Sequence, residues 1–291
     1  MIPEELARQI RMLEIRTDRM VDEISGGAYR SVFKGSGIEF DEVREYTIED
    51  DVRTIDWNVS ARMGVPYVKK FVEERELNIM LLVDVSASGA FGSGAKSKRQ
   101  SAAELAALIA FSASRNNDKV SLMMFSDKIE LYVPPRSGRR HILRLIREML
   151  AFKPENPGTD IALALKESAR ILKKRSVVFL ISDLIGNSDF SSALKQLNRR
   201  HDVIAVQIFD PVEREWPVNE SIELEDAETG EIITIPAGNS SELQQQLDLR
   251  NSSIAALCRS AKVDRVEIES GSEVIKPLIG FFAARRSRAG K

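Results

Sequence analysis

The feature that most constrains this chain is an apolar run at residues 79–83 that ends directly in Asp84-Val85-Ser86-Ala87-Ser88. Consecutive apolar residues without polar alternation predict a strand covered on both faces, as the strands of parallel sheets are. Glycines at positions 89, 92 and 94 follow, and then an Ala- and Leu-rich stretch at 101–111 that is typical of a buried helix. The order strand, loop, helix predicts the first unit of an α/β sheet.

The same alternation of strands and helices continues along the rest of the chain. It predicts an α/β fold with a doubly wound, mostly parallel, Rossmann-like sheet. Residues 128–133 alternate between polar and apolar and are expected to form an antiparallel edge strand, and residues 220–236 an inserted hairpin. The other expected strands are 120–125, 177–182, 203–209 and 265–268, and the expected helices are 139–150, 161–172, 189–199 and 240–262.

The N-terminal quarter differs in character from the rest. We expect residues 1–76 to form an N-terminal helix followed by a small, acidic, β-rich extension, and residues 77–291 to form the α/β domain. Residues 39–56 hold eight acids and two bases. We interpret this block as a surface or partner-binding module whose carboxylates pair with arginines, because no spacing of acidic residues, lysine or histidine in it matches a two-metal nuclease.

Oxygen-bearing side chains gather where the predicted parallel strands end. Asp84, Ser86 and Ser88 follow the first strand, Thr159 opens the helix that begins near 161, and Asp183 follows the strand at 177–182. Open α/β sheets bind ligands at this edge. Carboxylate and hydroxyl oxygens are hard ligands that suit Mg²⁺, Mn²⁺ or Ca²⁺. Taken singly, each residue is explained as a turn or helix-capping residue; taken together, the five favour a metal site.

These five residues resemble the metal-ion-dependent adhesion site of von Willebrand factor type A domains. More narrowly, the chain resembles domain-of-unknown-function family fifty-eight, a bacterial family with a type-A-like domain that is associated with MoxR-class AAA ATPases. The resemblance implies a type-A-like fold, a metal-dependent protein-binding site and a MoxR-class partner in the assembly or maturation of other proteins. It rests on residues 35–40, 43–46, 50–58, 61–62, 74–77, 134–140 and 210–211.

Composition excludes several other classes. The net charge of −2 gives no general attraction to nucleic acid or anionic membranes. The single cysteine, Cys258, allows no intrachain disulfide and fits a reducing compartment. Neither of the two histidines has a ligand partner at helical spacing, which argues against zinc. No stretch reaches the roughly 18–20 apolar residues of a membrane span, so we expect a cytoplasmic protein.

Two groups of basic residues stand out. Arg136, Arg139 and Arg140 surround the start of the helix at 139–150 and are candidates for contact with a partner protein. The tail at 285–291 carries four positive charges, and we expect it to be a frayed, solvated end, with a docking role as the minor alternative.

The resulting hypothesis is a metal-dependent protein-binding module without a catalytic constellation. Hydroxyl ligands are neutral, so a bound ion would keep net charge and an open position for a partner's carboxylate. The alternative is a metal-dependent phosphoester hydrolase that uses the same ion, with Asp56 or a neighbouring carboxylate as the base. A third reading is a metal-free scaffold with a turn-rich sheet edge.

Overall fold

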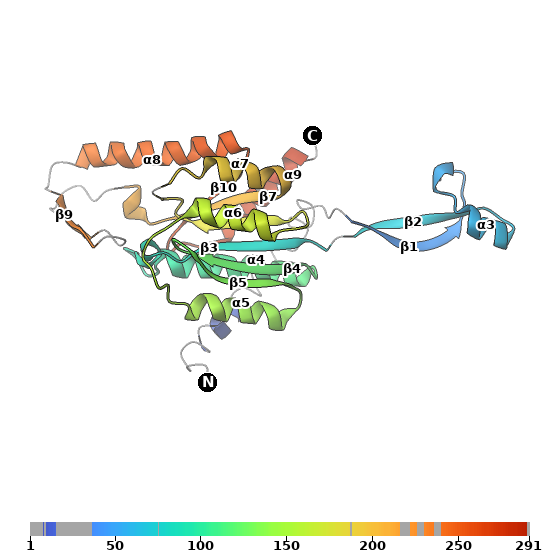
Figure 1. Cartoon of the computed structure of the whole chain (residues 1–291), viewed down its shortest axis with the longest axis horizontal. Helices are drawn as coiled ribbons and strands as arrows, with labels where there is room; N and C mark the ends of the chain where they lie inside the picture. The colour runs from blue at the N-terminus through green and yellow to red at the C-terminus, as the bar shows by residue number, and fades with distance from the viewer. Residues whose placement is uncertain are drawn as a thin grey trace. The chain divides into compact units, whose positions relative to one another are not determined.

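A computed structural model describes residues 8, 10–15, 37–74, 76–186, 188–215, 222–225, 230–235 and 240–289 (Figure 1). These residues form two compact units, one within residues 33–77 and the other containing everything else described. The expected boundary after residue 76 lies one residue before the boundary between the units. Residues 10–15 are helical and belong with the α/β unit, since Oε1 of Glu14 accepts hydrogen bonds from Arg139.

The α/β unit is built on a six-stranded sheet with the strand order β10-β7-β6-β3-β4-β5. All neighbouring strands are parallel except β4 and β5, which are antiparallel, so the predicted doubly wound, mostly parallel fold is confirmed. Residues 79–83 of β3 are all buried, as the unbroken apolar run requires. The strands are β3 (Asn78–Asp84), β4 (Lys119–Phe125), β5 (Ile129–Arg136), β6 (Val177–Ser182), β7 (Asp202–Phe209) and β10 (Asp264–Glu269).

Helices cover both faces of this sheet. Figure 1 shows α4 (Lys98–Arg115) and α5 (Arg139–Ala151) on one side, and α6 (Ile161–Ile171), α7 (Ser191–Arg200) and α8 (Ser240–Ala261) on the other. Residues 101–113 of α4 are all buried, as expected for a helix that is covered all round. On the opposite face one core cluster joins Leu82, Leu165, Leu194 and Cys258, so the lone cysteine is a core residue.

The C-terminal residues correct one expectation. The basic tail was expected to fray, but α9 (Ile275–Ala289) runs through most of it. The Arg285 guanidinium binds the Asp202 carboxylate at the start of β7, and Arg288 binds Asp264 at the start of β10. β8 (Ile222–Glu225) and β9 (Ile232–Ile235) pair antiparallel where the inserted hairpin was expected. No helix in the described parts of the chain is both long and apolar enough to cross a bilayer.

The smaller unit is a two-stranded antiparallel sheet with a structured connection. β1 (Gly37–Glu45) pairs with β2 (Tyr67–Glu74), and the connection carries η1 (Val52–Thr54) and α3 (Trp57–Met63). The Arg44 guanidinium donates two hydrogen bonds to the Asp50 carboxylate. Polar contacts thus order this connection, whereas five of its apolar side chains are exposed: Ile48, Val52, Trp57, Met63 and Val65.

Candidate functional site

A small cavity lies at the carboxyl end of β3. Its volume is about 20 Å³, enough for one water molecule or ion. Its polar wall comes from the ends of two neighbouring parallel strands and from the first turn of α4. The lining residues are Asp84, Ser88, Gly89, Lys98, Arg99, Ala102, Ile181, Ser182, Asp183 and Ile208.

Asp84 is the last residue of β3 and is held by hydrogen bonds from two loops. Oδ1 accepts from the backbone N–H of Ser86 (2.9 Å), and Oδ2 accepts from the hydroxyl of Ser182 (2.7 Å). Burial, followed by the nearby charge of Asp183, raises the pKa of Asp84 to about 6. This carboxylate is therefore fixed in place, and its charged form is disfavoured by burial and by Asp183.

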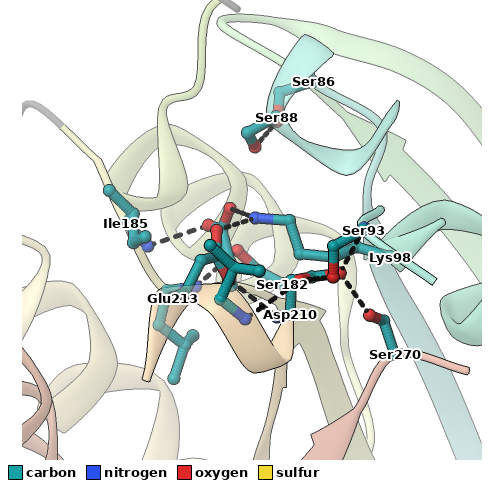
Figure 2. A network of polar contacts seen from close by, with 12 residues as sticks. Ser86, Ser88, Ser93, Lys98, Ser182, Ile185, Asp210, Glu213 and Ser270 are labelled. Carbon is teal, nitrogen blue, oxygen red and sulfur yellow. Dashed lines mark hydrogen bonds and ion pairs between the residues drawn. The ribbon is translucent and has the colours of Figure 1, made fainter. Parts of the chain in front are cut away.

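The two serines of the Asp-x-Ser-x-Ser stretch face one another. Figure 2 shows Ser86 and Ser88 together, and their hydroxyl oxygens lie 3.1 Å apart. Ser86 precedes the short helix η2 (Ala87–Ala90) but makes no side-chain capping bond to it, so the capping explanation fails for this serine. Both hydroxyls keep lone pairs that can serve as ligands.

Thr159 lies beside this loop but does not line the cavity. The backbone carbonyl of Pro157 accepts a hydrogen bond from the N–H of Ala87 (2.9 Å), which brings the two loops into contact. Asp160, not Thr159, caps α6, because its side chain accepts from the N–H of Leu163. The structure thus places Asp84, Ser88 and Asp183 around the cavity, with Ser86 next to Ser88 and Thr159 in the adjoining loop.

Sequence analysis missed Lys98, the first residue of α4. Its side chain is only 5% exposed, and the ammonium lies 2.9 Å from Oδ2 of Asp183 and 2.7 Å from Oε1 of Glu213 (Figure 2). Burial lowers the pKa of Lys98, but the two carboxylates outweigh it and the net shift is upward. A buried ammonium joined to two strand ends has no signal in the sequence, because Asp183 and Glu213 are 85 and 115 residues away.

Asp210 is a buried carboxylate to which the sequence assigned no role. It is fully buried after β7 and accepts hydrogen bonds from the backbone N–H of Ser93 (2.9 Å) and the Ser270 hydroxyl (2.8 Å). It also caps η3 (Pro211–Glu213). Burial alone would raise the pKa of Asp210, but these hydrogen bonds outweigh burial and lower it. One carboxylate therefore ties together three loops at the same edge of the sheet.

The remaining candidates lie elsewhere. Asp56, the proposed hydrolase base, belongs to the smaller unit, where it caps α3 and pairs with Lys69 (2.9 Å). Arg139 pairs with Glu14, while Arg136 and Arg140 are exposed. These contacts give Asp56 and Arg139 structural roles and leave Arg136 and Arg140 available for contact.

The donor set bears on which ion this edge could take. Within the described ranges, no group of three or more His, Cys, Asp or Glu side chains could hold a metal. A site here would use the carboxylates of Asp84 and Asp183 with the hydroxyls of Ser86 and Ser88. Such an all-oxygen set suits a hard ion such as Mg²⁺ and not zinc.

Comparison with known proteins now identifies the family. Over 289 residues the chain is 29% identical to "Uncharacterized protein Rv1480" of Mycobacterium tuberculosis, covering 98% of this chain and 91% of that protein. An aerotolerance-related membrane protein from Bacteroides fragilis has a similar fold, with 15% identity, a TM-score of 0.50 and coverage of 73% of this chain and 99% of that one. The VWA domain of SpRpn10 also matches, with 13% identity, a TM-score of 0.39 and coverage of 71% and 95%. The model of the family described as "Protein of unknown function DUF58" matches residues 42–251, and the chain belongs to that family.

Proposed function

We propose that this chain is a protein-binding module whose contact with its partner depends on a divalent ion at the carboxyl edge of the sheet. The observation that carries the proposal is the convergence of Asp84, Ser88 and Asp183 on one cavity, with the Ser86 hydroxyl 3.1 Å from that of Ser88. Oxygen-bearing side chains at the carboxyl ends of parallel strands lie where an α/β sheet offers a ligand site.

Some of these residues would bind the ion, and one orients a ligand. Asp84, Ser86 and Ser88 would hold the ion, and Thr159 and Asp183 would contribute from the adjoining loops. Ser182 fixes the Asp84 carboxylate through its hydroxyl. When bound, the ion would supply positive charge and an open coordination position for a carboxylate of the partner.

The partner class follows from the family resemblance. We propose a MoxR-class AAA ATPase that presents a glutamate or aspartate to this edge, and Mg²⁺ as the ion. No contact among the described residues favours Asp56 as the base of the phosphoester hydrolase alternative, since Asp56 is engaged as a helix cap and in an ion pair.

The test measures melting temperature and partner binding together. Mg²⁺ should raise the melting temperature of the wild type, because an ion that binds only the folded state stabilises it. Asp84→Asn should remove that rise and also the Mg²⁺-dependent binding to a purified MoxR-class ATPase. Asp127→Asn is the matched control, since Asp127 follows the neighbouring strand β4 and does not line the cavity. An equal response to Mg²⁺ in wild type and Asp84→Asn would refute the proposal.

A further inference from the structure

Lys98 occupies a costly position for a cation. Its side chain is 5% exposed, and burying an ammonium is unfavourable unless strong partners compensate. It is also the first residue of α4, where the positive end of the helix dipole disfavours a second positive charge. The two carboxylates of Asp183 and Glu213 offset both effects.

The charges that line the cavity already balance. Asp84 and Asp183 bring two negative charges, and Lys98 and Arg99 bring two positive charges. The Arg99 guanidinium is fixed on the backbone carbonyls of Val85 and Ser86, at 2.9 and 3.0 Å. A divalent ion entering this cavity would therefore meet a carboxylate, Asp183, that an ammonium already neutralises.

Lys98 also links the cavity to a more distant loop. Glu213, its second partner, caps η3 by accepting the N–H of Asp210 through Oε2 (2.9 Å) while Oε1 binds the ammonium. If Glu213 lost its charge, the ammonium would have Asp183 as its one remaining carboxylate partner. The charge of Glu213, in the loop after β7, therefore affects how strongly the Lys98 ammonium binds the Asp183 carboxylate.

We propose that Lys98 is a built-in counter-cation that limits the affinity of this edge for divalent ions by neutralising Asp183. The inference rests on the proposed metal site. It deepens that proposal, because a weakly held ion would be bound firmly only when a partner's carboxylate adds negative charge. At the effective dielectric constant of a protein, one charge a few ångströms from a divalent ion changes its affinity by about tenfold or more.

The experiment compares Mn²⁺ affinities by isothermal titration in the wild type, in Asp84→Asn and in three further charge variants. Lys98→Gln should bind Mn²⁺ at least about tenfold more tightly than the wild type. Lys96→Gln is the matched control, since Lys96 lies two residues away, pairs with Glu104 and does not line the cavity. It should bind as the wild type does. Glu213→Gln should bind more weakly, because the ammonium then turns fully to Asp183.

The outcomes separate the two proposals. Suppose that Asp84→Asn abolishes the Mn²⁺ binding of the wild type, but Lys98→Gln binds Mn²⁺ as tightly as the wild type or more weakly. That result would overturn the counter-cation role and support the metal site. No Mn²⁺ binding by any variant would overturn both. If Lys98→Gln melts too low in chelator to be titrated, Glu213→Gln decides, since it keeps the lysine: an unchanged affinity there would overturn the inference.

Discussion

The hydroxyl of Ser182 donates a hydrogen bond to Oδ2 of Asp84 across 2.7 Å, joining the ends of the neighbouring strands β6 and β3. The same hydroxyl oxygen accepts the N–H of Leu184, whose φ of 61° is in the left-handed region that a leucine rarely adopts. A single serine therefore both orients the carboxylate and supports a strained turn next to the cavity.

Replacing this serine should cost stability. Ser182→Ala leaves Asp84 without one donor and the N–H of Leu184 without its acceptor, so we expect a loss of about 1–3 kcal/mol in urea unfolding. Ser176→Ala is the control: that serine is also buried, lies just before the opposite end of β6, and donates to the carbonyl of Lys174. It should cost less. An equal loss in the two variants would argue against the supporting role of Ser182.

Gly92 is required by close packing before α4. A Cβ atom there would lie 2.7 Å from Cα of Ser97 and 2.8 Å from the carbonyl oxygen of Lys96, both backbone atoms. Gly92→Ala should therefore destabilise the fold by about 1–3 kcal/mol in thermal or urea unfolding. Gly94→Ala tests the same loop without the clash, since its Cβ would meet nothing within 4 Å, and should be nearly neutral. A neutral Gly92→Ala would mean that the loop yields easily.

Asp210 should be among the most sensitive polar residues. Asp210→Ala leaves the buried hydroxyl of Ser270 without its acceptor and also removes the acceptor of the N–H and hydroxyl of Ser93, which is exposed and can turn to water, so we expect a loss of about 1–3 kcal/mol. Asp210→Asn keeps one acceptor oxygen and should fall between this variant and the wild type. Chemical unfolding monitored by circular dichroism measures both. A loss below about 1 kcal/mol in the alanine variant would contradict the linking role.

His201 should make the fold sensitive to mild acid. Its ring is buried, neither ring nitrogen has a hydrogen-bond partner among the residues that the structure describes, and burial, then Arg200 and Arg175, lower its pKa from 6.5. The unfolded chain therefore takes up the proton first, and stability present above pH 6.5 is lost as the pH falls below it. His201→Leu should flatten the dependence of the unfolding free energy on pH between 7 and 5. If the unfolding free energy of His201→Leu kept the same slope against pH, other titratable groups would account for the acid sensitivity.

Trp57 should contribute little to stability although it is large and apolar. It is 68% exposed at the start of α3, so Trp57→Ser should change the unfolding free energy by less than about 0.5 kcal/mol. Asp56→Ala should instead speed hydrogen exchange of the amides in 57–63, because Asp56 caps this helix and binds Lys69. We expect the amides of residues 57–63 to exchange more slowly in Trp57→Ser than in Asp56→Ala. The reverse order would mean that Trp57, and not Asp56, stabilises this connection.

How far the sequence predicts this protein depends on where the partner of each residue lies. The strands β3, β6 and β7 are predictable because burial on both faces leaves at least four consecutive apolar residues in each. Asp84, Ser88 and Asp183 are predictable as neighbours because each follows a parallel strand or its loop.

The parts that the sequence does not predict depend on long-range contacts. Lys98 looks like any lysine in a first helical turn, and only the folded chain brings it to Asp183 and Glu213. Ser182 looks like the last residue of a strand, since its bond to Asp84 spans 98 positions. The tail was misjudged for the same reason: its arginines pair with Asp202 and Asp264, the first residues of strands far away in sequence.

The position of β10 at the end of the strand order has a consequence for biosynthesis. β10 pairs with β7 and is the last strand of the sheet to be synthesised, so a nascent chain that ends before residue 264 exposes one edge of β7. An unpaired buried strand is a template for aggregation. Synthesis of residues 264–269 therefore completes the sheet, and α9 then docks through Arg285 and Arg288, whereas a chain truncated before residue 264 should be insoluble.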